Sequence, residues 1–358
     1  MMTEQLKDLN AVRENGLALK HIKNQTEEIC LEAVRENGSA LEYVSDQTLE
    51  ICLAAVRQDY MALQYVRNQT EEICLEAVHH RGTALMYVIH QTDRICLAAV
   101  RETGTVLRMV EHQTEEICLA AVTKNGYAFE YVVEQTDEIC QLAITKDADN
   151  LKFIKHKTDA LCLAAVRQNG STLEYVTNQT REISLEAVRQ NGNALKYVTK
   201  QTQEICLEAV HKSPLALRHV QDQTEEMCLI AVRRNGAALE YVKHQTEEMC
   251  LIAVRHDGVL VGYVKNQTDE ICLEAVRTNF YALKYITHQT KEICLEAVAK
   301  DVKALKYIQN NRLKNSCIKA LHKDGKALQI KLVKESLVKD ILPILRQDLL
   351  NLFGKGKK

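Results

Sequence analysis

The sequence predicts an all-α solenoid: about thirteen helix-turn-helix repeats of 22 residues, stacked in a line and closed by a C-terminal capping helix. Three observations predict this class. A Gln-Thr pair recurs every 22 residues, apolar residues between the pairs have helical spacing, and an Asn-Gly pair falls between them in several repeats. This period overrides the two or three globular domains that 358 residues would ordinarily suggest.

The Gln-Thr pair sets the register of the repeat, with Gln as position 1. Lys157-Thr158 replaces it once, so thirteen copies follow one another without an insertion. The glutamines are Gln25, Gln47, Gln69, Gln91, Gln113, Gln135, Gln179, Gln201, Gln223, Gln245, Gln267 and Gln289. We expect this Gln to bond with backbone groups of its own turn, because its side chain looks too short to bridge neighbouring repeats.

Each residue type has a local reason to recur, as the copy that begins at Gln25 shows. Thr26 is a good N-cap, and acidic residues follow it in the first turn, where the helix dipole favours them. A stripe at i, i+1, i+4 and i+5 is apolar, from Ile29 to Val34. Asn37-Gly38 then ends the helix, and we expect Gly38 to adopt the left-handed conformation of a C′ residue.

A second, shorter helix is expected after each Asn-Gly turn. In the same copy it would bury Ala40, Leu41, Tyr43 and Val44. Neither helix reaches the ~12–15 residues that an isolated helix needs, so both depend on stacking against neighbouring repeats.

Three regions are predicted. Residues 1–16 form an N-terminal cap that keeps only the second half of a helix, and residues 17–310 form the solenoid. Residues 311–358 comprise a divergent last repeat with a one-residue slip, an amphipathic helix over 330–353 and a basic tail. We expect that helix to cover the open end of the stack, with dimerisation or membrane contact as alternatives.

Charge is distributed unevenly along the chain. Residues 299–358 carry 15 Lys and Arg against 5 Asp and Glu, whereas residues 1–298 carry 31 against 43, a balance of −12. No signal peptide and no apolar run long enough to cross a membrane are evident. We therefore expect an intracellular protein that is not secreted.

Cysteine recurs at position 6 of the repeat, within the apolar stripe. Equivalent positions one repeat apart, at roughly 10 Å, are too distant for a shared metal ion or a disulfide. We expect reduced, buried thiols and no metal or other cofactor. The column comprises Cys30, Cys52, Cys74, Cys96, Cys118, Cys140, Cys162, Cys206, Cys228, Cys250, Cys272 and Cys294.

Arginine recurs at position 11, in the last turn of the first helix. Guanidinium groups at regular intervals could follow a phosphate backbone or an acidic peptide, or each could pair with a glutamate of its own or the neighbouring repeat. We expect pairing and keep the column as a candidate binding stripe. Its members are Arg35, Arg57, Arg101, Arg167, Arg189, Arg233, Arg255 and Arg277.

Tyrosine dominates position 19, from Tyr43 to Tyr307. Such a column could stack nucleic-acid bases, but its place between Leu and Val favours core packing with the hydroxyl at the edge. No phosphate-binding glycine loop, nucleophile elbow or H-E-x-x-H segment occurs. Near-identical units offer no asymmetric cluster of catalytic groups, so we expect no enzymatic activity.

The segments Q-T-x-E-I-C-L-x-A-V and N-G-x-A-L-x-Y-V resemble uncharacterised helical-repeat proteins of giant DNA viruses, the mimivirus relatives, over residues 9 to about 310. The resemblance implies a viral protein of the host cytoplasm or the virion, and it assigns no site residues. Two functions stay open: a monomeric scaffold that binds a protein or peptide through its variable positions, or a nucleic-acid-binding solenoid that uses the arginine column and the basic C-terminal region.

Overall fold

The computed structural model describes residues 2–323, which form helices joined by short turns, with no strand in that range. The predicted all-α solenoid is confirmed. The chain divides into two units, Met1–Glu186 and Ala187–Lys358, with the boundary inside α9 (Arg181–Gln190). The predicted amphipathic helix over 330–353, the basic tail and hence most of the C-terminal region lie outside the described residues.

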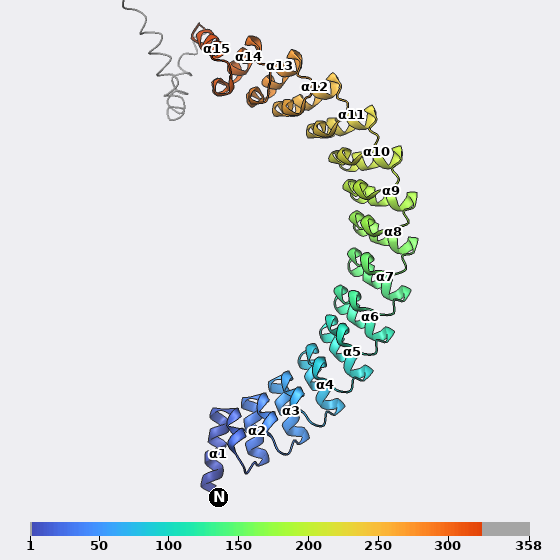
Figure 1. The fold of residues 1–358 in the computed structure, drawn as a ribbon, viewed down its shortest axis with the longest axis vertical. Coiled ribbons are helices and arrows are strands. Elements are labelled where there is room, and N and C mark those ends of the chain that lie inside the picture. The colour runs from blue at the N-terminus through green and yellow to red at the C-terminus, as the bar shows by residue number, and fades with distance from the viewer. Residues whose placement is uncertain (1, 324–358) are drawn as a thin grey trace, which may run out of the picture. The chain divides into compact units, whose positions relative to one another are not determined.

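In the first unit an α-helix and a short 3-10 helix, labelled η, alternate along the chain (Figure 1). The α-helices are α1 (Met2–Glu14), α2 (Glu27–Glu36), α3 (Leu49–Gln58), α4 (Glu71–His80), α5 (Asp93–Glu102), α6 (Glu115–Lys124), α7 (Asp137–Lys146) and α8 (Asp159–Gln168). The 3-10 helices are η1 (Gly16–His21), η2 (Gly38–Tyr43), η3 (Tyr60–Tyr65), η4 (Gly82–Tyr87), η5 (Gly104–Met109), η6 (Gly126–Tyr131), η7 (Ala148–Phe153) and η8 (Gly170–Tyr175).

The second unit repeats this alternation. Its α-helices after α9 are α10 (Gln203–Lys212), α11 (Glu225–Arg234), α12 (Glu247–His256), α13 (Asp269–Thr278), α14 (Lys291–Lys300) and α15 (Asn311–Lys323). Its 3-10 helices are η9 (Gly192–Tyr197), η10 (Pro214–His219), η11 (Gly236–Tyr241), η12 (Gly258–Tyr263), η13 (Phe280–Lys284) and η14 (Val302–Tyr307).

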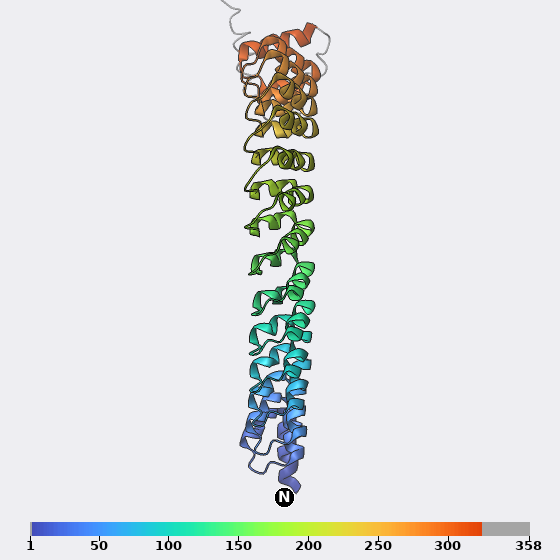
Figure 2. The ribbon, with the colours of Figure 1, turned by 90° about the vertical axis from the view of Figure 1, so that its right-hand side faces the viewer.

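Within each unit the helices form two rows, one of α-helices and one of 3-10 helices (Figures 1 and 2). Within a unit an α-helix packs on the α-helix of the next repeat and on the 3-10 helices before and after it, as α3 does on α4, η2 and η3. Successive 3-10 helices also pack on one another, as η2 does on η3. Contacts between neighbouring repeats therefore build the whole core, as expected of a solenoid.

Capping side chains set where both kinds of helix begin. Thr26 Oγ1 accepts a hydrogen bond from the Ile29 amide at 3.4 Å, and the equivalent threonines do the same in the other copies. Asn37 has two roles. Its backbone N–H donates to the Ala33 carbonyl at the end of α2, and its side-chain Oδ1 accepts from Ser39 N at 3.0 Å at the start of η2. One residue thus ends the α-helix and starts the 3-10 helix.

The left-handed conformation expected of Gly38 is wrong. Gly38 is the first residue of η2, and its φ is not in the positive range. The close approach of the next repeat explains the glycine, because an added Cβ would lie 2.7 Å from the Ala55 carbonyl oxygen.

The core consists of small and branched apolar residues. Ile29, Ala33, Val34 and Leu41 are at most 1 % exposed, and the same positions are buried in the other repeats except at Leu305, which is half-buried. Alanine at position 9 leaves room for close helix contacts, while Ile and Leu fill the remaining space. Since no single repeat encloses these side chains, their burial depends on both neighbours.

The ends of the described chain differ in part from the prediction. The N-terminal cap contains a full helix, α1, where only half of one was expected. The last described helix is α15, which buries Cys317 and Leu321 against the array. No described helix is both long and apolar enough to cross a membrane.

Candidate functional site

The candidate arginine stripe lies in the last turn of successive α-helices, where a positive charge suits the helix dipole. All eight side chains are largely exposed, as Arg57 is at 60 %. Each one makes an ion pair with a glutamate. The pairs are Arg35–Glu32, Arg57–Glu76, Arg101–Glu116, Arg167–Glu186, Arg189–Glu208, Arg233–Glu248, Arg255–Glu274 and Arg277–Glu296, with N–O distances of 2.7–3.8 Å.

The partner of each arginine depends on position 8 of the next repeat. Where that residue is glutamate, the arginine reaches it across the repeat boundary, as in the 2.7 Å contact of Arg57 with Glu76. Where it is apolar, another glutamate takes its place. In the repeat after Arg101 this position is Ala120, and Arg101 pairs instead with Glu116, in the first turn of α6.

These ion pairs neutralise the positive charge of the stripe but contribute little to the free energy of folding. Hydrogen bonds from Arg13 and then Arg35 lower the pKa of Glu32, so this carboxylate stays charged at neutral pH. Exposed pairs of this kind contribute about 0–1 kcal/mol each. With a carboxylate beside every guanidinium, the column offers little net positive charge to a polyanion.

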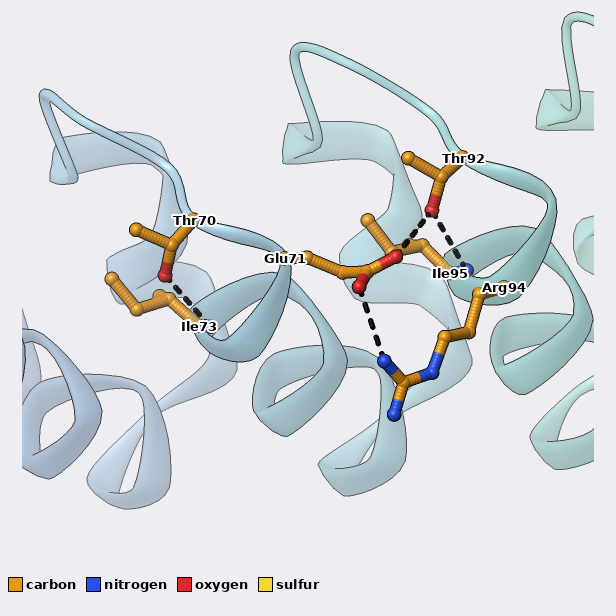
Figure 3. Close-up of polar contacts among 6 residues, drawn as sticks. All are labelled: Thr70, Glu71, Ile73, Thr92, Arg94 and Ile95. Atoms are coloured by element: carbon orange, nitrogen blue, oxygen red, sulfur yellow. Dashed lines mark hydrogen bonds and ion pairs between the residues drawn. The ribbon is translucent and has the colours of Figure 1, made fainter.

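A second network links the first turns of successive α-helices (Figure 3). Glu71 accepts a hydrogen bond from Thr92 Oγ1 at 3.0 Å and pairs with Arg94 Nη1 at 3.1 Å. Thr92 in turn accepts from Ile95 N at 3.4 Å, so one threonine caps its helix and contacts the preceding repeat. Acidic residues of the first turn therefore link neighbouring repeats, in addition to interacting favourably with the helix dipole.

The glutamine at position 1 bridges successive turns. Gln113 Nε2 donates to the Tyr131 carbonyl at 2.9 Å, and its Oε1 accepts from Val133 N at 3.0 Å, both in the next turn along the stack. It also donates to Leu107 O, in its own turn, at 3.3 Å. The expected bonding to backbone is confirmed, but the expectation that this side chain could not bridge neighbours is wrong.

Lysine interrupts this series of bridges at one place. Lys157 donates from Nζ to the Ile154 carbonyl of its own turn at 2.9 Å. An ammonium group has no oxygen to accept the amide hydrogen of Thr177, which occupies the place of Lys155 one bridge earlier. The sequence marks this position only by the missing Gln.

The cysteine column is buried as predicted, with every member at most 4 % exposed. Burial raises the pKa of these thiols, to about 11 for Cys74, Cys96 and Cys272. Several also donate to the glutamine of the same repeat, as Cys96 Sγ does to Gln91 Oε1 at 3.5 Å. Protonated, enclosed thiols of this kind serve as small core residues.

One pair of cysteines departs from the expected separation. Cys317 follows Cys294 by 23 residues instead of 22, and both side chains are fully buried between α14 and α15. Their thiols hydrogen-bond to each other, which raises the pKa of Cys294 and lowers that of Cys317. The one-residue slip thus brings together two thiols that a strict repeat would keep apart.

Tyrosines at position 19 lie at the edge of the core. Eight of them are half-buried: Tyr43, Tyr65, Tyr87, Tyr131, Tyr175, Tyr197, Tyr241 and Tyr307. Tyr263 and Tyr285 are the exceptions, at 41 % and 44 % exposure. The expected core packing therefore holds for most of the column and fails at these two positions.

Residues 2–323 contain no cluster of three or more His, Cys, Asp or Glu side chains that could hold a metal ion. The geometry instead provides a repeated surface whose charges are paired along the α-helices. The fold and this surface define the class of protein: a helical-repeat solenoid.

Comparison with known families agrees with that class. Five segments match the family described as "Domain of unknown function (DUF4116)", at residues 9–49, 26–71, 160–203, 180–224 and 268–314, which together cover just under half of the chain. The chain is thus similar to an uncharacterised repeat family. No curated protein and no solved structure matches it.

Proposed function

We propose that the protein is a non-enzymatic scaffold that binds other proteins through the exposed side of its 3-10 helices. The main observation behind this proposal is that positions 17 and 18 of the repeat differ in burial and in variability. Position 17 is a buried apolar residue in nearly every repeat, whereas position 18 is exposed throughout and changes in charge and size. Along the chain, position 18 reads Lys20, Glu42, Gln64, Met86, Arg108, Glu130, Lys152, Glu174, Lys196, Arg218, Glu240, Gly262, Lys284 and Lys306.

A constant core with a variable surface suits a binding protein, because side chains at position 18 can change without disturbing the stack. Specificity then comes from the order of charges along the row of 3-10 helices. The resemblance to giant-virus repeat proteins supports a viral scaffold that acts in the host cytoplasm or in the virion. Binding to nucleic acid is the alternative, and the paired state of the arginines makes it the weaker one.

Affinity capture from a host-cell lysate, with bound proteins measured by mass spectrometry, tests this proposal. One variant reverses three neighbouring charges at position 18: Arg108→Glu, Glu130→Lys and Lys152→Glu. The matched control removes charge from the arginine column instead, with Arg57→Gln and Arg101→Gln.

The scaffold proposal predicts that position-18 reversal removes partners that survive nuclease treatment, whereas the arginine variant retains them. In parallel, binding of labelled single-stranded RNA and duplex DNA is titrated with salt. The nucleic-acid alternative replaces the scaffold under two conditions. The captured complexes dissociate on nuclease treatment, and the affinity for RNA or DNA falls steeply with salt and with loss of the arginines.

A further inference from the structure

Exposed aromatic residues gather on η12 and η13 of the second unit, next to η14. Tyr263, Tyr281 and Tyr285 are 41–44 % exposed, although large apolar rings usually lie inside. The three helices pack in order, η12 on η13 and η13 on η14, so these side chains belong to one continuous face. Together with Lys284, Lys303 and Lys306 they form what we call the tyrosine–lysine surface.

Ring contacts hold this surface in place. Tyr281 stacks on Phe280 with centroids 4.4 Å apart and meets Tyr307 of the next repeat at 5.3 Å. Tyr285 lies against Gly262, where an added Cβ would sit 3.5 Å from the ring. All other repeats carry a side chain at position 18, so the glycine here leaves the part of the Tyr285 ring next to it open. Pre-ordered aromatic rings lose little conformational entropy when a partner binds.

The charge on this surface has one sign. Lys284, Lys303 and Lys306 are exposed, and no ion pair among the described residues involves them. The three 3-10 helices contain no Asp or Glu. Asp257 and Asp301, the N-caps of η12 and η14, accept hydrogen bonds from backbone amides and make no ion pair with these lysines. Positive charge is therefore unbalanced here, unlike on the arginine stripe.

We propose that the tyrosine–lysine surface docks an acidic segment of a partner protein, in which carboxylates alternate with apolar side chains. Carboxylates would meet the three lysines, and the apolar groups would cover the tyrosine rings. Tyrosine is among the residues that contribute most to protein interfaces. The inference rests on the proposed scaffold function and assigns one partner chemistry to one part of the second unit.

Single-stranded nucleic acid would require free ring faces for base stacking. Phe280 already covers one face of Tyr281, and Lys284 Nζ lies 5.3 Å from the centre of the Tyr285 ring. These contacts occupy ring faces that bases would need for stacking, and they leave the remaining exposed ring surface to apolar side chains.

Fluorescence anisotropy on the full chain tests the proposal with a fluorescein-labelled synthetic peptide in which glutamates flank phenylalanines. Two further probes are the same peptide with lysine in place of glutamate and a labelled oligouridylate. Two variants alter the surface: Tyr281→Ser and the charge reversal Lys284→Glu with Lys306→Glu. Tyr127→Ser is the matched control, because Tyr127 is an exposed tyrosine at the same repeat position in the first unit.

The acidic peptide should bind, and each surface variant should weaken it about tenfold, in the range of a single interface hot spot. The control variant should bind the peptide with unchanged affinity, and all variants should keep the circular dichroism spectrum of the original chain, since the altered side chains are exposed. Absence of binding, or equal loss in the control, overturns the proposal, as does tighter binding of oligouridylate through the same lysines. If the position-18 variants of the first unit still lose their partners, the scaffold function stands even when this surface fails.

Discussion

Replacing Gln113 with leucine tests whether the glutamine bridges hold neighbouring repeats together. The change keeps the approximate size of the side chain and removes two short hydrogen bonds, to Tyr131 O at 2.9 Å and from Val133 N at 3.0 Å. It also removes a longer one to Leu107 O at 3.3 Å and a weak one from Cys118 Sγ at 3.6 Å. Each neutral hydrogen bond contributes about 0.5–1.5 kcal/mol net. Because Val133 is 58 % exposed, water can replace part of the loss, and we expect a local destabilisation of about 2 kcal/mol.

Native-state hydrogen exchange is the suitable assay, because a long repeat array need not unfold in a single step. A local loss of about 2 kcal/mol corresponds to roughly 30-fold faster exchange of the Val133 amide. The amide of Lys155, which bonds to Gln135 Oε1 at 2.9 Å, serves as an internal control and should change little. Unchanged exchange at Val133 would refute the claim that the bridge stabilises the turn.

The chain also offers the reverse experiment. Lys157→Gln should restore the missing bridge, add about 1 kcal/mol of local stability and slow exchange of the Thr177 amide several-fold. A decrease in stability would show that the bond of Lys157 to Ile154 O matters more than the bridge.

Three further predictions concern the caps, the glycines and the thiols. Thr114→Ala should cost about 1 kcal/mol in urea unfolding, because Thr114 Oγ1 caps α6 through Ile117 N at 3.4 Å. Gly104→Ala should lower the melting temperature because its Cβ would lie 2.5 Å from Ala121 O, whereas Gly262→Ala, with no contact below 3.5 Å, should be nearly neutral. The free energy of unfolding should fall between about pH 9 and pH 11, since thiols in the unfolded chain release protons that the buried thiols retain. Each thiol contributes about 1.4 kcal/mol to this fall for every unit by which folding raises its pKa. Urea unfolding with Cys74→Ser should show a smaller fall, and an unchanged pH dependence would contradict this origin.

Local signals in the sequence were sufficient to locate the helices. Threonine at position 2 and asparagine or aspartate at position 13 cap through side chains within three residues of their targets. Such bonds depend only on residues close in the chain, so pattern and spacing predict them well.

The glycine interpretation failed although the sequence held a contrary signal. Pro214 occupies the position of Gly38 in another repeat, and proline cannot adopt a positive φ. Tyr60 and Phe280 at this position also indicate ordinary backbone geometry. Close approach to the following repeat, which explains the glycine, becomes visible only when the repeats are stacked.

The reach of the glutamine was misjudged for a related reason. Spacing between helix axes is not the distance between a side chain and the next turn, and the turns lie close enough for Gln113 to contact both. The choice of partner for each arginine likewise depends on whether the next repeat presents glutamate or alanine at position 8.

The sequence by itself thus determined the period, the two helices of each repeat, their caps and the buried positions, because all of these follow from residues a few places apart. Only the tertiary structure decided the contacts between residues about 18–26 apart: the glutamine bridges, the Cys294–Cys317 contact and the packing of Tyr281 against Tyr307. These contacts depend on the offset of one repeat against the next. That offset is set by packing across the whole interface between repeats, which no single repeat specifies.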